Sequence, residues 1–375
     1  MVQTLTEGTT LFTTDSAAKI SADMPVFYNP VMKRNRDLTL VMLAAMPTWM
    51  RAPLRIALPL EASGIRAARI LNELVRPGVL VPASIAVNDR SAIAIGFARE
   101  NCERNRAGYP TDRVACSVMD ANAFLRALGG AEYVDIDPFG TPNPFLDAAV
   151  QAVTRGGILA VTATDTSALA GTYPRATARK YWATPSRTWG MHEWGLRILI
   201  RKIQLVAAQH DRALTPVLSI ATDHYYRIFL RNDGSSATRI SAMLASHGLV
   251  RVDTTTLAAV PTTETVGATG PLWLGPLHDI EVVRAMRDAL SRLEPIVFAD
   301  LDKLLAIIED EARVGALGFI DLHELSSALG VQCPRRDAVL ERLGERAGRT
   351  HLCGSGIVTR VPVTEVADIV RAITR

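Results

Sequence analysis

The sequence predicts an α/β protein with a doubly wound, mostly parallel sheet, followed by a second domain that is mostly helical. Short β-branched runs alternate with stretches of helical periodicity from Leu54 to about Ala163. This alternation is typical of the β–α units that build a parallel sheet. The alternation is gone beyond Gly234. The chain has 375 residues, enough for two domains of roughly 100–200 residues each.

The predicted elements of the sheet follow a lead-in. Residues 1 to about 24 are rich in threonine and alanine and predict an irregular or β-ribbon segment, and an apolar helix ending at Met50 comes next. The predicted strands are Arg55–Leu58, Ser84–Val87, Val114–Ser117, Tyr133–Ile136 and Ile158–Ala163. The helices predicted after the first four strands are Ile65–Val75, Ser91–Arg106, Ala121–Leu128 and Phe145–Thr154.

The second half of the chain changes in character. A long amphipathic helix is predicted at 194–210, and 217–221 and 225–230 are expected to close the sheet. The turn residues Asn232-Asp233-Gly234 suggest a domain boundary, which gives domains 1–232 and 233–375. Near the end, helices at 319–330, 335–348 and 363–375 with a ribbon at 350–361 predict a small helical module.

Composition excludes several classes of protein. The chain is 48% hydrophobic and 21% charged, as is common in soluble globular proteins. Its apolar runs are shorter than the ~18 residues of a membrane span, and no secretory signal is evident, so we expect a cytoplasmic protein without a membrane partner. The net charge of +3 permits an anionic partner without requiring one. The four cysteines form no C-x-x-C pair, which indicates neither zinc nor disulfides.

Polar clusters follow each of the first four predicted strands. The carboxyl ends of parallel strands form one edge, where ligands bind in such folds. A lone aspartate after a strand is more often a helix cap, but four clusters in order predict a class I S-adenosylmethionine-dependent methyltransferase. The clusters are Glu61-Ala62-Ser63-Gly64-Ile65-Arg66, Asp89, Asp120-Ala121 and Asp137-Pro138-Phe139.

A nicotinamide dinucleotide fold is the rival interpretation of this edge. That fold needs a G-x-G-x-x-G turn to hold a pyrophosphate. The first turn here contains only Gly64, and an acidic Glu61 would repel the pyrophosphate. The methyltransferase is therefore favoured.

The fourth cluster, Asp137-Pro138-Phe139-Gly140, suits chemistry at an exocyclic amine. The lone pair of a nucleobase amino group is delocalised into the ring, which makes it a poor nucleophile. A carboxylate and a backbone carbonyl can accept its two hydrogens and orient the lone pair, while an aromatic ring stacks on the base. Proline fixes φ near −65°, so the turn is stiff.

The chain resembles the tRNA (guanine-N2)-dimethyltransferases that act at position 26, in particular their archaeal branch. The resemblance extends in order over nearly the whole chain, which makes it specific. The segments that carry it are Phe27-Tyr28-Asn29-Pro30-Val31-Met32, Asn35-Arg36-Asp37, Ser63-Gly64-Ile65-Arg66-Ala67, Asp135 to Pro142, Thr162 to Thr166, His192-Glu193, His224-Tyr225-Tyr226-Arg227, Gly270-Pro271-Leu272-Trp273 and Arg349-Thr350-His351.

The resemblance implies a role for each matching residue. Arg36 and Arg66 fall where the family contacts S-adenosylmethionine. Asp89 falls at the ribose position, and Asp120 with Ala121 at the adenine. Asp137 and Pro138 fall at the catalytic strand end, and Phe139 at the base-stacking position.

Phe27 has two interpretations. It could anchor the N-terminal segment in the core, or it could sandwich the flipped guanine together with Phe139. A further segment after the fifth strand is basic and aromatic, and it suits contacts to phosphates and bases. Its residues are Tyr173, Arg175, Arg179, Lys180, Tyr181, Arg187 and Trp189.

The activity implied is transfer of methyl groups from S-adenosylmethionine to guanine 26 of tRNA, with the second domain docking the tRNA. Two alternatives stay open: a methyltransferase for another exocyclic amine, in adenine or a ribosomal guanine, and a non-catalytic tRNA-binding protein. Several family members carry cysteines before the Gly270-Pro271-Leu272-Trp273 motif, whereas this chain has Pro261-Thr262-Thr263-Glu264. We therefore expect no metal. The oligomeric state is left open.

Overall fold

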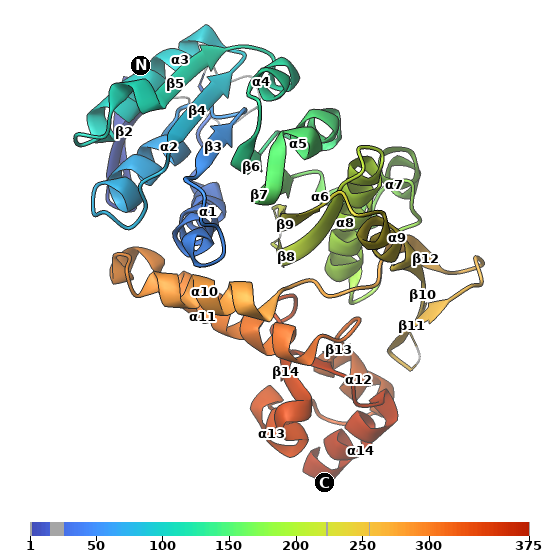
Figure 1. Ribbon diagram of the computed structural model, residues 1–375. Helices are drawn as coiled ribbons and strands as arrows, with labels where there is room; N and C mark the ends of the chain where they lie inside the picture. Colours follow the sequence, from blue (N-terminus) through green and yellow to red (C-terminus); the bar gives the residue numbers. More distant parts are fainter. Residues whose placement is uncertain (1, 16–25, 223, 255, 375) are drawn as a thin grey trace. The chain divides into compact units, whose positions relative to one another are not determined.

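The computed structural model describes residues 2–15, 26–222, 224–254 and 256–374 (Figure 1). The chain forms two compact units, each built from three segments. The first comprises Met1–Ala163, Phe229–Gly234 and Arg284–Lys303. The second comprises Thr164–Ile228, Ser235–Val283 and Leu304–Arg375. The boundary expected between residues 232 and 233 stays a prediction.

The central sheet has the strand order β5-β4-β3-β6-β7-β9-β8. The pairs β4–β5, β3–β4, β3–β6 and β6–β7 are all parallel. The predicted fold class is confirmed, because the strands alternate with helices along the chain. The bounds in the first unit are β3 (Arg55–Leu58), α2 (Ile65–Arg69), β4 (Ser84–Asp89), α3 (Ala92–Asn105), β5 (Val114–Val118), α4 (Ala121–Ala127), β6 (Ala131–Ile136), α5 (Leu146–Ala152) and β7 (Val153–Ala163).

Two features of the sequence misled the placement of elements in this sheet. The helix expected to reach Thr154 ends at Ala152, because the β-branched pair that follows it enters β7. The expected turn at Asn232-Asp233-Gly234 is wrong, since β9 (Tyr226–Gly234) runs through it. The buried Asn232 amide donates to the Val153 carbonyl and accepts from the Gly234 N–H, both at 2.9 Å. Asparagine can thus occupy this strand without an unmet polar group.

The N-terminal lead-in is a β-ribbon in its described part. Strands β1 (Val2–Glu7) and β2 (Thr10–Asp15) pair in antiparallel fashion, and Gly8 takes a positive φ of 62° between them. The rest of the expected lead-in lies outside the described residues. A short 3₁₀ turn, Pro30–Met32, then leads into α1 (Lys33–Ala45), most of whose side chains are buried.

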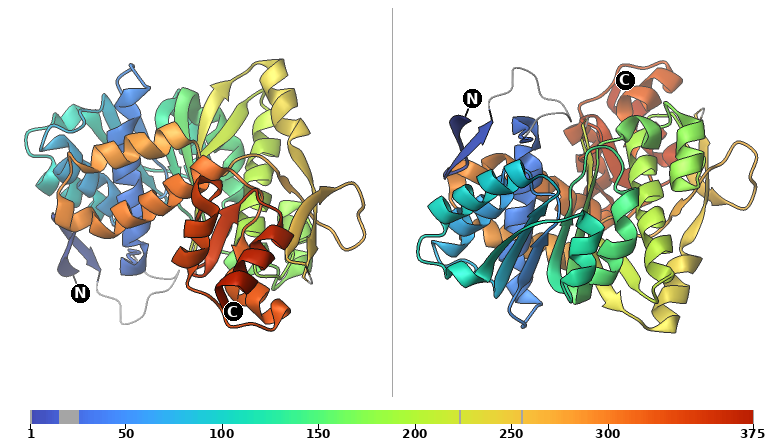
Figure 2. Two further views of the ribbon diagram at one scale, coloured as in Figure 1. Left: turned by 90° about the horizontal axis from the view of Figure 1, so that it is seen from below. Right: turned by 90° about the horizontal axis from the view of Figure 1, so that it is seen from above.

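The second unit combines helices with two small sheets. Its ribbon of β10 and β11 extends away from the helices of this unit (Figure 2). Helices α10 (Ile280–Leu290) and α11 (Pro295–Val314) contribute to both units. The other bounds are α6 (Thr166–Leu169), α7 (Pro174–Tyr181), α8 (Met191–Ala208), β8 (Ala213–Ala221), α9 (Ala237–Ala245), β10 (His247–Asp253), β11 (Ala258–Thr262), β12 (Thr269–Trp273), β13 (Ile320–Asp321), α12 (Leu322–Leu329), α13 (Arg336–Leu343), β14 (Ala347–Arg349), β15 (Gly356–Thr359) and α14 (Val363–Thr374).

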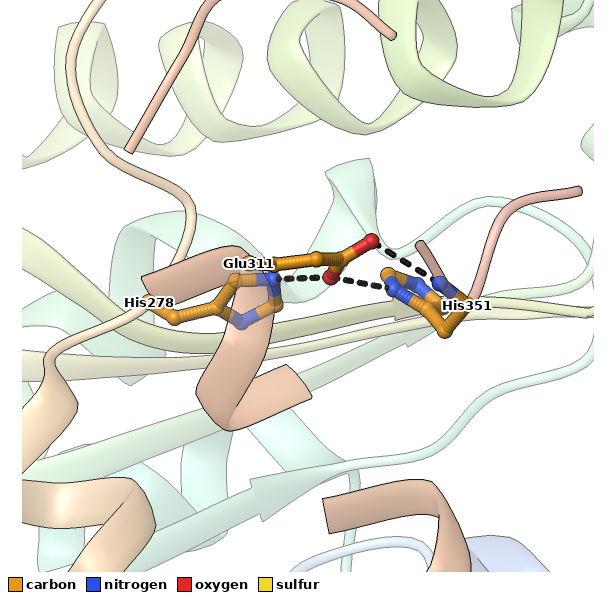
Figure 3. Close-up of side chains that lie close together, drawn as sticks. All are labelled: His278, Glu311 and His351. Carbon is orange, nitrogen blue, oxygen red and sulfur yellow. Dashed lines mark hydrogen bonds and ion pairs between the residues drawn. The ribbon is translucent and has the colours of Figure 1, made fainter. Parts of the chain in front are cut away.

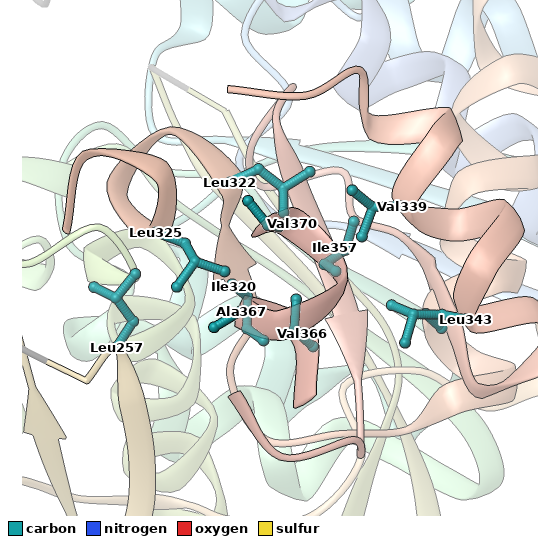
Figure 4. Packing of buried hydrophobic residues seen from close by; sticks show 11 residues of the cluster. Leu257, Ile320, Leu322, Leu325, Val339, Leu343, Ile357, Val366, Ala367 and Val370 are labelled. Carbon is teal, nitrogen blue, oxygen red and sulfur yellow. The ribbon is translucent and has the colours of Figure 1, made fainter. Parts of the chain in front are cut away.

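The C-terminal helical module predicted from the sequence is present, with its own apolar core (Figure 4). Helices α12, α13 and α14 enclose this core, and β15 lies between β13 and β14. The expected ribbon at 350–361 is shifted, because its first strand is Ala347–Arg349. Leu257, which precedes β11, belongs to the same core. No helix in the described part of the chain is long and apolar enough to cross a membrane.

Candidate active site

The candidate site lies at the carboxyl edge of β5, β4, β3 and β6, which are neighbours in the sheet. Gly64, the residue before α2, shows how tightly this edge is packed. Gly64 has a φ of 76°, and a Cβ there would lie 2.5 Å from the Ala98 Cα of α3. Only glycine allows the turn and this close approach. Because these four neighbouring strands are parallel and end at the same edge, the residues that follow them lie in one region of the first unit.

Arg66 is the charged centre of this edge. Its side chain, on α2, is only 6% exposed, and its Nη2 forms an ion pair with Asp137. Nη1 lies 3.4 Å from Asp135 and donates to the Thr39 hydroxyl at 2.6 Å. Asn35 Oδ1 accepts from both terminal nitrogens at 3.1 Å. The methionine carboxylate of a cofactor could reach these two nitrogens only by displacing one of the present partners.

Asp137 follows β6 and is partly exposed, with Arg66 as its one recorded side-chain partner among the described residues. Asp135 is buried two residues earlier, where the Tyr133 hydroxyl donates to it at 2.7 Å. The Thr39 hydroxyl also donates to Asp135, at 3.2 Å. Arg66 therefore joins a solvated carboxylate to a buried and hydrogen-bonded one.

The rings of Phe27 and Phe139 touch. Their centroids are 4.1 Å apart and their planes make an angle of 72°, an edge-to-face contact. Phe139 is 51% exposed. The structure brings the two predicted stacking residues together, but no base fits between rings at this distance. A sandwich around guanine remains a proposal, and it requires one ring to move.

Arg36 has a different environment from the one the resemblance suggests. Its Nε donates to Glu7 at 2.7 Å, its Nη2 is paired with the same carboxylate, and Nη2 also donates to the Asn29 carbonyl at 2.9 Å. The guanidinium carbon lies 5.3 Å from the centre of the Tyr28 ring. Only Nη1 has no recorded partner in the described part of the chain. Arg36 thus fixes the segment that carries Phe27.

Glu7 is a functional candidate that the sequence did not reveal. It is the one buried residue of β1, and it accepts from Arg36, from Arg69 at 3.0 Å and from the Tyr28 hydroxyl at 3.0 Å. Burial raises the pKa of Glu7, but the hydrogen bonds and charges of Arg36 and Arg69 outweigh it and hold the pKa below its usual value. The local sequence of the ribbon does not predict a buried carboxylate, because the partners of Glu7 lie about 20–60 residues away in the sequence.

Asp89 and Asp120 hold backbone groups. Asp89 accepts from the N–H of Ala62 at 3.0 Å and from the N–H of Ser91 at 2.9 Å, which ties β4 to the turn after β3. Asp120 caps α4 by accepting from the N–H groups of residues 122 and 123. Ala121 is buried at the start of that helix. Their expected roles toward a cofactor stay predictions.

Glu61 is buried beneath the same turn and accepts from the Ala67 N–H at 2.9 Å. Burial raises its pKa to about 8, against the opposing effect of Arg66. The carboxyl is therefore mostly protonated at neutral pH, so it would repel a pyrophosphate less than the sequence suggests. The missing glycines remain the stronger argument against a dinucleotide fold.

A cluster of His278, Glu311 and His351 in the second unit has the composition of a metal site (Figure 3). Glu311 Oε2 lies 3.0 Å from His278 Nε2 and 2.7 Å from His351 Nδ1. The other nitrogens of the two rings accept backbone N–H groups, His278 from Ser219 at 3.4 Å and His351 from Ala221 at 3.3 Å.

These hydrogen bonds assign the protons of the two rings. A nitrogen that accepts an N–H carries no proton, so the proton of each neutral ring lies on the nitrogen that faces Glu311. A metal ion would need lone pairs on those nitrogens, with the protons on the other side. The surroundings therefore favour two imidazoles that donate to one carboxylate, and they do not suit a metal.

Comparison with known proteins identifies the family. The model of the family described as N2,N2-dimethylguanosine tRNA methyltransferase matches residues 8–371. The chain belongs to this family.

Relatives and a solved structure agree over nearly the full length. The chain is 36% identical over 366 residues to the tRNA (guanine(26)-N(2)/guanine(27)-N(2))-dimethyltransferase of Aquifex aeolicus, covering 92% of this chain and 90% of that protein. It is 33% identical to the tRNA (guanine(26)-N(2))-dimethyltransferase of Methanobrevibacter smithii, covering 100% and 98%. The complex of Trm1 from Pyrococcus horikoshii with S-adenosyl-L-methionine has a TM-score of 0.86 at 30% identity, with both chains fully covered.

We expect Glu7→Gln to destabilise the first unit. The substitution leaves two buried arginines short of one anion, and breaking such a pair costs about 3–5 kcal/mol. Urea unfolding followed by circular dichroism measures this loss. Glu100→Gln, at an exposed position of α3, is the control and should change stability by less than ~0.5 kcal/mol. Equal stability of the two variants would show that Glu7 holds nothing in place.

The second unit should lose stability as the pH falls below about 6.5. Burial lowers the pKa of His278 from its usual 6.5, with Glu311 opposing, so the unfolded chain binds a proton first and stability falls with pH. Burial raises the pKa of Glu311, but His351 and His278 together outweigh it and lower the pKa below its usual 4.5. Glu311 therefore adds a second loss of stability below that pH. Urea unfolding between pH 8 and 5 measures the slope.

The matched variants for this measurement are His278→Gln and His323→Gln. The first should flatten the slope between pH 7 and 5, and the second, at an exposed position of α12, should leave it unchanged. Part of the slope should survive in both, because burial and Arg201 lower the pKa of His247 to about 4. An unaltered slope in His278→Gln would contradict the lowered pKa of His278.

Proposed function

We propose that this chain transfers methyl groups from S-adenosylmethionine to the exocyclic N2 of guanine 26 in tRNA, giving N2-methyl- and N2,N2-dimethylguanosine. The observation that carries the proposal is Asp137, ion-paired to the buried Arg66 next to the exposed ring of Phe139, in a chain of this family. The names of the relatives from Aquifex aeolicus and Methanobrevibacter smithii support guanine 26 as the acceptor. The cytoplasm, where tRNA is available, is the compartment we propose.

The residues at the sheet edge suit this cofactor. Nη1 of Arg36, and Arg66 once one of its present partners is displaced, would offer cationic donors for a methionine carboxylate, and Asp89 would offer an acceptor for ribose hydroxyls. Asp120 and Ala121, at the start of α4, are the residues proposed to contact the adenine. When bound, S-adenosylmethionine supplies a methyl group on positively charged sulfur, and transfer leaves the neutral S-adenosylhomocysteine.

Asp137 is the group proposed to act on the acceptor. Arg66 pairs with its Oδ2, so the other oxygen is left to accept a hydrogen of the guanine amino group. The Pro138 carbonyl is the second acceptor, and together they aim the lone pair of N2 at the methyl carbon. As the N–C bond forms and the C–S bond breaks, N2 becomes positively charged and its proton passes to Asp137. Positioning supplies much of the acceleration in such a displacement.

A guanine in the folded tRNA has to leave its stack before N2 can reach this edge. Phe139, whose ring is half exposed, offers a stacking surface for the extruded base, and Phe27 offers a second ring next to it. The docking of the tRNA itself is proposed for residues 233–375 together with the basic and aromatic segment from Tyr173 to Trp189.

The direct test is to incubate the protein with radiolabelled S-adenosylmethionine and an unmodified tRNA transcript and to identify the labelled nucleoside after digestion. We expect N2-methyl- and N2,N2-dimethylguanosine, both lost when guanine 26 is replaced. Label that persists would assign guanine 27, which the name of the Aquifex aeolicus relative includes. Label in another nucleoside, or none, would favour another amine or a non-catalytic role.

Asp137→Asn should lower the rate of transfer by about 10²–10⁴-fold, the range for loss of a positioned acid–base group. Binding of S-adenosylmethionine, measured by calorimetry, should survive because Arg66 remains. Asp112→Asn, at an exposed position, is the control and should be fully active. A variant at position 137 that keeps near-normal rate would remove Asp137 from this role.

Phe139→Ala should reduce transfer by roughly 5- to 100-fold, the range for loss of one base–aromatic stack. Its free energy of unfolding should fall by no more than about 0.5–1.5 kcal/mol, the contribution of the lost ring pair with Phe27. Phe139→Tyr keeps an aromatic face and should retain most activity, whereas Phe139→Leu keeps apolar volume alone and should not. Steady-state rates of methyl transfer to tRNA distinguish the variants. Equal rates for Phe139→Leu and Phe139→Tyr would contradict a stacking role of the ring.

A further inference from the structure

Trp182 in the second unit is an exposed tryptophan held in an unusual conformation. It follows α7 with φ 56° and ψ 42°, the left-handed region that bulky residues rarely adopt. Its N–H donates to the Ala178 carbonyl at 3.1 Å, and its carbonyl accepts from Arg201 at 3.3 Å. Two residues on, Thr184 exchanges two hydrogen bonds of 2.7 Å with Gly270. The backbone is thus fixed on both sides of a ring that is 48% exposed.

A lysine lies over this ring. The Nζ of Lys202, on α8, is 3.0 Å from the centre of the Trp182 ring. The lysine is only 7% exposed, and no carboxylate within ion-pair distance of it is recorded among the described residues. Burial, with Arg201 second, lowers its pKa to about 8. An aromatic face attracts a cation, but it does not neutralise one.

The neighbouring charges increase this imbalance. Arg201 also lacks an acidic partner among the residues that the structure describes, and its Nε is buried without a hydrogen bond. Other cations of the same unit are paired: Arg197 with Glu193 at 2.8 Å, and Lys180 with Asp165 at 3.2 Å. Lys202 and Arg201 thus place two adjacent cations, without an acidic partner among the described residues, next to a fixed indole.

A ligand that carries both a negative charge and a flat ring would complement these groups, because the ring can stack on Trp182 and the charge can compensate Lys202 and Arg201. We propose that Trp182, Lys202 and Arg201 form a docking site for a nucleotide of the tRNA, in which a base stacks on the face of the indole that Lys202 does not cover and a phosphate compensates the two cations. The site rests on the proposed function, because tRNA is the polyanion that this activity requires. Stacking on aromatic rings combined with cationic phosphate contacts is the usual means of holding unpaired nucleotides.

Neighbouring residues agree with this occupant. Helix α7, which ends next to Trp182, exposes Arg175 and Arg179, and Tyr173 precedes it with its ring exposed. Burial and Arg201 lower the pKa of His247 to about 4, so this histidine is neutral at pH 7 and compensates neither cation. The surface therefore presents positive charge and aromatic rings together. A cationic or purely apolar ligand would leave Lys202 and Arg201 uncompensated.

The test uses Trp182→Ala, Trp182→Phe and Lys202→Met in the full chain. Fluorescence anisotropy of a labelled, unmodified tRNA transcript gives affinity over a series of salt concentrations. Trp182→Ala should weaken binding by roughly 5- to 100-fold, and Trp182→Phe should restore most of the loss. In steady-state assays the loss should appear in the KM for tRNA rather than in kcat. Arg104→Ala, an exposed arginine of α3 in the first unit, controls for the loss of one positive charge and should bind as the wild type does.

Lys202→Met separates a docking role from a structural one. The substitution keeps most of the buried stem and removes the charge. The slope of log affinity against log salt should fall by about one, and the Tm should not fall, because an uncompensated buried cation is lost. A lowered Tm with unchanged affinity and slope would make Lys202 structural and overturn the proposal.

The remaining outcomes are equally distinct. Wild-type tRNA affinity in Trp182→Ala would overturn the docking site while leaving the activity intact, provided that the wild-type protein methylates the same transcript. Absence of methylation by the wild type would count against the proposed function instead. Polyglutamate that binds the wild type but not Lys202→Met, without competing with tRNA, would assign the surface to an acidic protein partner and also overturn the proposal.

Discussion

Burial of arginine in the first unit is the constraint on which the rest of the site depends. A guanidinium stays protonated in proteins, so each buried arginine must be surrounded by anions or strong acceptors. Arg66 is met by Asp135 and Asp137, and Arg69, on the same helix, by Asp37 and Glu73 as well as Glu7. One short helix therefore organises the carboxylates of β6, α1 and the N-terminal ribbon.

This arrangement links residues that are distant in sequence. Glu7 accepts from both Arg36 and Arg69, and Arg36 holds the Asn29 carbonyl next to the segment with Phe27. A ribbon that contributes no atom to the proposed chemistry thereby helps to place an aromatic ring at the site. Buried ion pairs are weak evidence for stability, but they tolerate few alternative arrangements, and this selectivity suits a site that must present a base and a methyl donor together.

The parallel sheet and its carboxyl edge were predictable because they depend on local signals. Strands of β-branched residues, turns with Gly64 and acidic residues after each strand can be recognised without knowing what lies across the sheet. Glu7 could not be found in this way, since its burial depends on three partners from three other segments. The turn predicted at Asn232 was wrong for a related reason. Asparagine is common in turns, but here its side chain donates to the Val153 carbonyl, which lets it occupy a strand. Trp182 could not be singled out from the sequence either, because the feature that distinguishes it is the contact of its ring with Lys202 on the next helix.

The mutual contact of Phe27 and Phe139 affects the balance between capture and release. Each ring covers apolar surface of the other when no base is present, and such an aromatic pair contributes about 0.5–1.5 kcal/mol. A guanine that enters between the rings, as proposed, would have to replace that contact, so its net gain would be smaller than the full stacking energy. A departing guanine would recover part of its loss as the rings close. The ring pair would then limit how tightly a finished product is held, which would favour repeated turnover on successive tRNA molecules.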